Sequence, residues 1–185
     1  MKTIFLFFSL LMFCFLGVEG QVPDLPLSFT NEEVRRFKES VEPYCVQYHE
    51  EENEGSERLY KRRGIYKPYI TRRGERVDIN VLHKESRISI ENGYYYIYKI
   101  EAPNVQHLEI SFDNFFLSYS SYMFIYNEFN YFKSVKKLMS TNYSDVVIIG
   151  SNPVQGNQLI IEVFELENNH RPNNIRINEI MRVIK

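Results

Sequence analysis

The sequence contains no tryptophan and very little cysteine. Its 185 residues include 2 Cys and no Trp. Cys14 lies in an apolar run at the N-terminus, so Cys45 is the only cysteine in the rest of the chain. A lone cysteine excludes an internal disulfide framework. The domain is therefore expected to depend on its hydrophobic core alone for stability.

An excess of charge of one sign is also missing. The chain has 22 Lys+Arg and 24 Asp+Glu, which gives a formal net charge of −2. This near-neutral balance offers no argument for nucleic-acid binding or for attachment to a membrane surface. The content of 44% hydrophobic and 25% charged residues is typical of a globular chain, and the length predicts one domain.

The N-terminus has the pattern of a signal peptide. Lys2 precedes an apolar run from Ile4 to Val18, and Gly20 stands where a signal peptidase would cut. We expect residues 1–20 to be removed and the protein to be secreted, extracellular and without a membrane anchor. The alternative is a transmembrane segment, but a run of about 15 residues is short for a span of roughly 20.

Cys45 has two interpretations in a secreted chain. Val46 and Tyr48 beside it are apolar, which favours a buried or half-buried thiol. The alternative is an intermolecular disulfide through Cys45 with a partner chain. A nucleophile is not indicated, because no histidine stands in a recognisable cysteine-protease context.

One helix is predicted over residues 31–42. Thr30 and Glu33 fit a capping box, in which two side chains bind the free amides of the first turn. Pro43 would end the helix. Three apolar residues then form a narrow stripe with helical spacing: Val34, Phe37 and Val41.

Residues 49–76 change from an acidic run to a basic one with interleaved tyrosines. A flexible, solvated surface segment is the favoured interpretation. A second is proteolytic processing after Arg63 or Arg76, since proteases cut exposed basic loops. A third is a polyanion- or RNA-binding stripe, which the neighbouring acidic run would weaken.

From residue 77 onward the hydrophobic pattern changes to that of strands. Residues 77–81 alternate with period two, and Asn92-Gly93 predicts a tight hairpin. The expected strands are 77–81, 88–90, 94–100, 108–112, 122–126, 146–149, 159–164 and 175–177. We therefore predict a mainly β protein, an antiparallel β-sandwich or jelly roll over residues 77–185, preceded by an N-terminal segment over residues 21–76 that holds the one short helix.

Five segments of this strand region carry a resemblance to a known family: residues 96–103, 108–115, 123–126, 153–164 and 175–180. In these segments the chain is similar to the secreted accessory domain that precedes the catalytic unit in bacterial trypsin-type proteases of the lysyl-endopeptidase kind. The resemblance implies a CUB-like or jelly-roll sandwich. Tyrosines stand where tryptophan is typical, and the chain ends where a protease domain would begin, so no catalytic triad is carried over.

The sequence shows no signature of an enzyme. It has neither a nucleophile elbow, nor a zinc-protease motif, nor a phosphate-binding loop. His107 and Glu109 share one strand face, but two ligands do not make a zinc site. Glu109, Asp113 and Glu162 could supply paired carboxylates for a hydrolase, and a calcium site near Asp113 is conceivable. We expect no cofactor and no metal.

The tyrosine-rich strand suggests a binding role. Tyr94, Tyr96 and Tyr98 share one face of the strand, and an exposed row of three rings would bind a sugar or an extended peptide. The alternative is that both faces of the strand are covered. The predicted function is therefore a secreted, non-catalytic binding or accessory protein with a protein or carbohydrate partner. The alternatives are a secreted hydrolase with an unrecognised carboxylate site and a precursor processed at its basic motifs.

Asn142 is predicted to be glycosylated. Asn142-Tyr143-Ser144 is the only Asn-x-Ser/Thr sequence in the chain. The residues around it are small or polar, which is typical of a surface loop.

Overall fold

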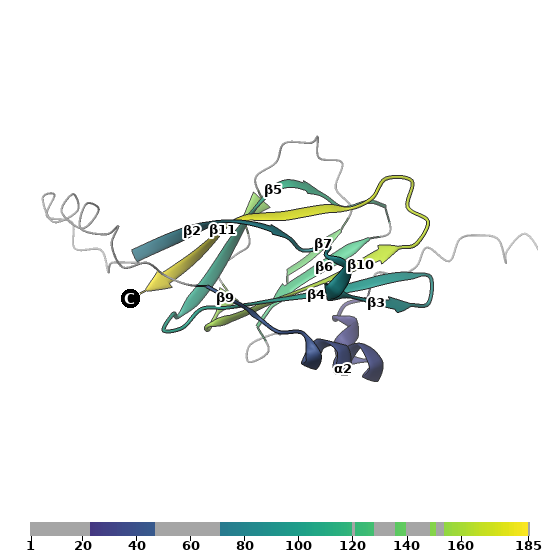
Figure 1. Cartoon of the computed structure of the whole chain (residues 1–185), viewed down its shortest axis with the longest axis horizontal. Helices are drawn as coiled ribbons and strands as arrows, with labels where there is room; N and C mark the ends of the chain where they lie inside the picture. The colour runs from purple at the N-terminus through teal and green to yellow at the C-terminus, as the bar shows by residue number, and fades with distance from the viewer. Residues whose placement is uncertain are drawn as a thin grey trace, which may run out of the picture.

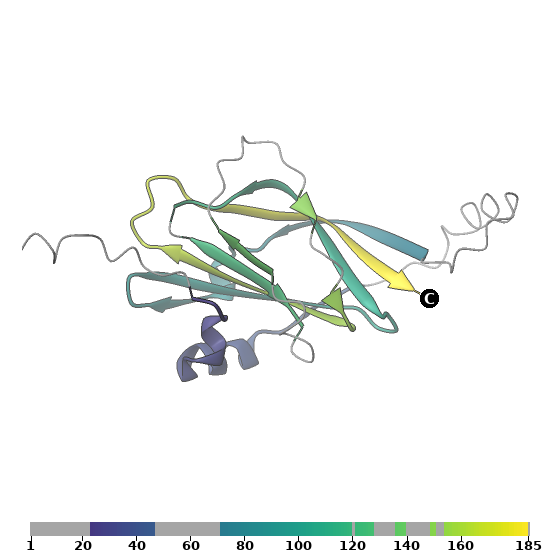
Figure 2. The same cartoon turned by 180° about the vertical axis from the view of Figure 1, so that it is seen from behind.

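The computed structural model describes residues 23–46, 71–119, 121–127, 136–139, 149–150 and 154–184. Two β-sheets pack face to face, and the single α-helix of the described chain lies on the outer side of one of them (Figure 1). Figure 2 shows the same three layers from behind. The expected β-sandwich with one short N-terminal helix is confirmed.

The first sheet carries the helix. Its strand order is β1-β4-β10-β6-β7, with β3 also paired to β4. β1 pairs with β4 in parallel, and the other pairs are antiparallel. Its strands are β1 (Tyr44–Cys45), β3 (Arg87–Ile90), β4 (Gly93–Glu101), β6 (Tyr122–Tyr126), β7 (Lys136–Met139) and β10 (Gln158–Leu166).

The second sheet faces the first across the main core. Its order is β2-β11-β5-β8, with β9 also paired to β5, and all of these pairs are antiparallel. Its strands are β2 (Thr71–Asn80), β5 (His107–Phe116), β8 (Ile149–Gly150), β9 (Val154–Gln155) and β11 (Asn174–Ile184).

Two hydrophobic clusters follow from the period-two alternation of the strands. The larger cluster fills the space between the sheets and includes Leu108, Ile110 and Phe112 of β5. The smaller cluster lies on the outer face of the first sheet, where the helix covers Tyr95 and Ile97 of β4. Both faces of β4 are therefore covered, one by the second sheet and one by the N-terminal segment.

The helix α2 (Glu32–Ser40) confirms the predicted helix, but its cap differs. The side chain of Asn31 accepts from the amides of Glu33 and Val34 at 2.9 and 3.1 Å. Thr30 instead donates to the carbonyl of Leu27, which belongs to the short 3-10 helix η1 (Leu27–Phe29). The N-cap is therefore Asn31 and not Thr30, and the predicted Thr30–Glu33 capping box does not form, because both the hydroxyl and the amide of Thr30 donate to Leu27 of η1.

β2 begins at Thr71, before the expected boundary at residue 77. From residue 74 to 80 its side chains alternate between exposed and half-buried positions. Glu75 occupies an inward position and Arg76 an exposed one, so charged residues concealed the strand periodicity at this end. Residues 71–76, which we assigned to the charged N-terminal segment, are part of the sandwich.

The hairpin between β3 and β4 forms at the predicted place. Ile90 pairs with Gly93, so the two loop residues are Glu91 and Asn92. Asn92 adopts a φ of 70°, a conformation that asparagine tolerates better than most residues. Gly93 serves a different purpose, because a β-carbon there would collide with the carbonyl oxygen of Glu165 on the neighbouring β10.

Candidate functional site

The three tyrosines of the predicted binding row lie on the inner face of β4. Tyr96 is only 4% exposed, and its hydroxyl donates to Glu165 Oε2 at 2.9 Å. The ring of Tyr94 is half-buried beneath the guanidinium of Arg87, at 4.3 Å from the ring centre. The second sheet covers this face, so the rings do not form an exposed platform. Tyr98 lines a cavity.

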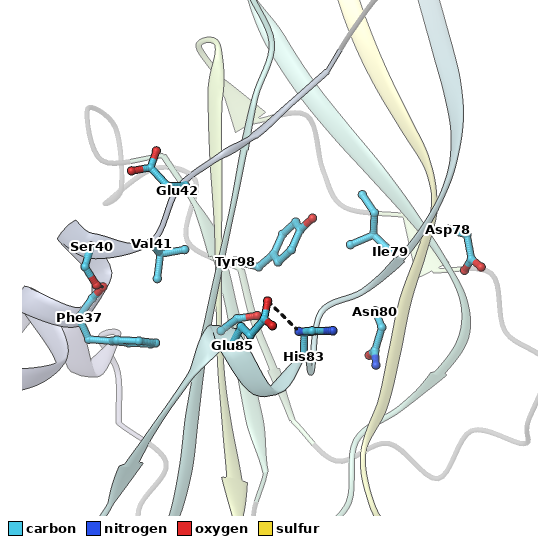
Figure 3. A pocket seen from close by; sticks show the side chains of 11 residues that line it. Phe37, Ser40, Val41, Glu42, Asp78, Ile79, Asn80, His83, Glu85 and Tyr98 are labelled. Carbon is cyan, nitrogen blue, oxygen red and sulfur yellow. Dashed lines mark hydrogen bonds and ion pairs between the residues drawn. The ribbon is translucent and has the colours of Figure 1, made fainter.

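That cavity lies at one edge of the sandwich, between the two sheets and the end of α2 (Figure 3). Its volume is about 510 Å³, which is within the range of small-ligand pockets. The short 3-10 helix η3 (Lys84–Ser86) forms another of its sides. The lining residues are Phe37, Ser40, Val41, Glu42, Asp78, Ile79, Asn80, His83, Glu85, Ser86 and Tyr98.

The cavity has a floor and a rim of different chemistry. We call its half-buried aromatic and aliphatic residues the floor, and its exposed polar residues the rim. The floor consists of Phe37, Val41, Ile79 and Tyr98. The rim consists of Ser40, Glu42, Asp78, Asn80, His83 and Glu85. A ligand here would contact apolar surface with its body and carboxylates with its outer end.

The charges of the rim are mainly negative. The carboxylate of Glu85 lies 3.7 Å from Nδ1 of His83. Asp78 is engaged from outside the cavity, where Nε of Arg176 donates to Oδ1 of Asp78 at 3.1 Å. Glu42 adds a third carboxylate at the end of α2. Of these three acids, Glu42 and Glu85 lie beside the cavity, whereas the carboxylate of Asp78 points away from it (Figure 3). His83 is the single basic side chain among the lining residues that the structure describes.

The phenol of Tyr98 is neutral at physiological pH. Burial, with a smaller effect of the nearby Tyr44, raises the pKa of Tyr98 to about 12. Its hydroxyl can therefore donate a hydrogen bond to a ligand, and its ring face can interact with an apolar group or a cation.

A buried polar network fixes α2 and η1 on the first sheet. Glu162 on β10 is fully buried, and its carboxylate accepts hydrogen bonds from three hydroxyl groups. Ser28 donates to Oε1 at 2.5 Å and Tyr95 to Oε2 at 2.7 Å, while Tyr126 also donates to Oε1. Ser28 belongs to η1, so this network joins the N-terminal segment directly to the sheet.

Lys38 completes this network from α2. Its side chain is 6% exposed, and its ammonium group lies 3.4 Å from the hydroxyl of Tyr126. The same ammonium lies 4.9 Å from the ring centre of Phe29, close enough for a cation–π interaction. Lys38 directly follows Phe37 of the cavity floor, so the network also fixes the position of Phe37 in the cavity.

The carboxylates considered for a hydrolase lie on different sides of the molecule. Glu162 projects from the outer face of the first sheet. Glu109 and Asp113 alternate with the core residues of β5, so they project from the outer face of the second sheet. His107 shares that face. Within the described residues, no three His, Cys, Asp or Glu side chains gather as metal ligands.

Cys45 is exposed, which contradicts the expected buried or half-buried thiol. Tyr44 packs against the main core and Val46 is buried, so the residue between them in an extended chain points outward. The apolar neighbours occupy the inward positions themselves. An intermolecular disulfide through Cys45 remains a prediction.

Several predicted sites lie outside the described residues: the signal peptide over residues 1–20, the cleavage site at Arg63 and the glycosylation site at Asn142. Arg76 is described. It is exposed on β2 and opposite Glu179 in the ladder with β11, so cleavage there requires this strand pair to open.

The sequence did not predict the cavity or the buried network. Their residues come from segments far apart in the chain, and none forms a local motif.

In the part of the chain that the structure describes, no helix has the length and apolar character needed to cross a membrane. We find no match of the chain to any protein-family model or to a curated protein. The similarity to protease accessory domains remains a prediction.

Proposed function

We propose that the protein is a secreted, non-catalytic binding protein that engages a protein or glycan partner through the cavity at the edge of its sandwich. The observation that carries this proposal is the cavity itself, with its apolar floor, its polar rim and the neutral phenol of Tyr98. Apolar and aromatic surface with a few convergent polar groups is the usual composition of a ligand site.

Two further observations support the proposal. The cavity is built on rigid elements, because β2 and β4 are each paired along most of their length and α2 is fixed by the Glu162 network. The apolar leader at residues 4–18 supports secretion. A domain exported to the outside and carrying a preformed cavity is well suited to recognise a partner there.

The test is a comparison of partner capture by three forms of the secreted chain. Ser40→Trp places a large ring at the rim, on an exposed position, and is expected to block the cavity. Ser89→Trp is the matched control, because Ser89 is an exposed residue of β3 that does not line the cavity. Partners retained by the wild type and by Ser89→Trp, but lost with Ser40→Trp, would support the proposal.

The opposite outcome is equally informative. A partner that binds all three forms with the same affinity would show that the cavity is not the site. Mass spectrometry of the secreted product tests the precursor alternative, since a processed precursor would appear as fragments cut near Arg63 or Arg76.

A further inference from the structure

We propose that the cavity binds a basic side chain, lysine or arginine, presented by an extended segment of a partner protein. This inference rests on the proposed function and specifies the ligand of the same site. It follows from the order of the chemistry around the cavity: apolar surface inside and carboxylates outside. Lysine and arginine have the complementary order, with an apolar stem and a cationic tip.

The charge of the rim selects for a cation. Of the three carboxylates among the lining residues, that of Asp78 points away from the cavity and has the guanidinium of Arg176 beside it. Glu42 and Glu85 lie nearer to α2 and η3, on the other side of the Tyr98 ring from Asp78 (Figure 3). His83 offsets this charge only when it is protonated. A bound ammonium or guanidinium group would neutralise the excess, whereas a neutral glycan would leave it in place.

The apolar floor of the cavity favours a ligand with a chain of methylene groups, as in lysine or arginine. Val41 of the segment after α2 and Ile79 of β2 approach from opposite sides, with Tyr98 of β4 between them (Figure 3). A chain of methylene groups placed there would lose contact with water along the whole depth of the cavity. The ring of Tyr98 would add a cation–π interaction, which is stronger in such a partly desolvated place than at an exposed one.

The experiment is a titration of the folded mature chain with five short probes, followed by the backbone amide signals of an isotope-labelled sample. Four probes are capped pentapeptides with two glycines on each side of lysine, arginine, norleucine or glutamate. The fifth is a neutral trisaccharide. Norleucine keeps the stem of lysine and lacks the ammonium group, so it isolates the contribution of charge.

We expect the lysine and arginine peptides to shift the amide signals of residues 79–86 and of Tyr98. The norleucine peptide should bind up to about fivefold more weakly, and the glutamate peptide should not bind measurably. A fivefold change corresponds to about 1 kcal/mol, the upper range for an exposed ion pair. Raising the salt concentration from about 0.05 to 0.5 M should weaken lysine binding and leave norleucine binding unchanged.

Variants assign the effect to named groups. Glu42→Gln combined with Glu85→Gln should lower the affinity for lysine about three- to tenfold. Glu39→Gln is the control, because Glu39 is an exposed acidic residue near the end of α2 that does not line the cavity. Tyr98→Phe keeps the ring and should bind lysine almost normally, while Tyr98→Leu should lose about two- to tenfold.

The outcomes separate this inference from the proposed function. Equal affinity for the lysine and norleucine peptides, or cavity shifts with the trisaccharide alone, would overturn the basic-side-chain ligand while the cavity remained the binding site. Shifts that appear with protein concentration alone, and vanish with Glu42→Gln, would mean that a second copy of this chain is the occupant. No shift in the cavity with any probe, together with capture that survives Ser40→Trp, would overturn both proposals.

Discussion

Replacing Glu162 with glutamine should destabilise the protein far more than the small change in side-chain volume suggests. Glu162→Gln keeps the length of the side chain and one carbonyl acceptor, but removes the negative charge. Three hydroxyl groups now donate to this carboxylate, and they come from Ser28, Tyr95 and Tyr126. The amide nitrogen of glutamine is a donor, so at least one of the three hydroxyls must turn round or lose its acceptor.

The size of the effect can be estimated from these bonds. A hydrogen bond to a charged group contributes about 1.5–3 kcal/mol, and a buried donor without an acceptor costs about 1–3 kcal/mol. Removal of the desolvation cost of the carboxylate partly offsets these losses. We expect Glu162→Gln to lower the free energy of unfolding by about 2–3 kcal/mol. Glu162→Ala, which also leaves a cavity, should lower it by about 4–5 kcal/mol.

Urea unfolding, followed by tyrosine fluorescence and circular dichroism, measures this loss; the chain has no tryptophan to complicate the signal. Ile160→Val is the matched control, since Ile160 is a buried residue of the same strand and lies two residues from Glu162 on the same face. It should cost about 0.5–1.5 kcal/mol. If Glu162→Gln changed the free energy of unfolding by less than Ile160→Val, the network would not be what holds the N-terminal segment on the sheet.

Four further predictions follow from single residues. Gly93→Ala should cost about 1–3 kcal/mol in urea unfolding, because the added methyl group meets backbone of β10. Burial, and less strongly Glu162, raises the pKa of Tyr122 to about 12, so the folded state holds this proton more tightly than the unfolded state. The stability it contributes is present below about pH 10 and lost between about pH 10 and 12, and Tyr122→Phe should flatten the fall in unfolding free energy over that window. The exposed thiol of Cys45 should react with a disulfide reagent in the folded protein, and a thiol that reacts only in denaturant would contradict the described β1. Endoglycosidase treatment of protein secreted by a eukaryotic host should reduce its mass through loss of a glycan at Asn142, and an unchanged mass would count against this site.

Local patterns predicted the fold well. The helical stripe led to α2 and Asn92-Gly93 to the β3–β4 hairpin, because each depends on neighbouring residues only. The predictions failed where a distant partner decides the environment. The start of β2 was missed because its residues are charged and show no hydrophobic alternation; only their pairing with β11 makes them a strand. Cys45 was predicted to be buried, but the neighbouring Tyr44 and Val46 occupy the inward positions.

The candidate site was not predictable from the sequence in the same way. The network joins Ser28 to Glu162, which are 134 residues apart, and no spacing rule links them. The cavity combines the end of α2 with η3, β2 and β4. The tyrosine-rich strand was the one useful signal. It singled out Tyr98 as part of an exposed row of rings, whereas the structure covers that face of β4 and places Tyr98 in the cavity instead.

The position of the N-terminal segment has a consequence for the order of folding. Ser28 leaves the ribosome early, yet its acceptor on β10 is made only after more than 130 further residues. Closing so long a loop is entropically costly, and contacts at such separation slow folding. Docking of η1 and α2 is therefore expected to follow assembly of the sheet. Substitution of Ser28 should then speed unfolding and leave the folding rate almost unchanged. The part of the chain that is synthesised first is thus among the last to reach its native place.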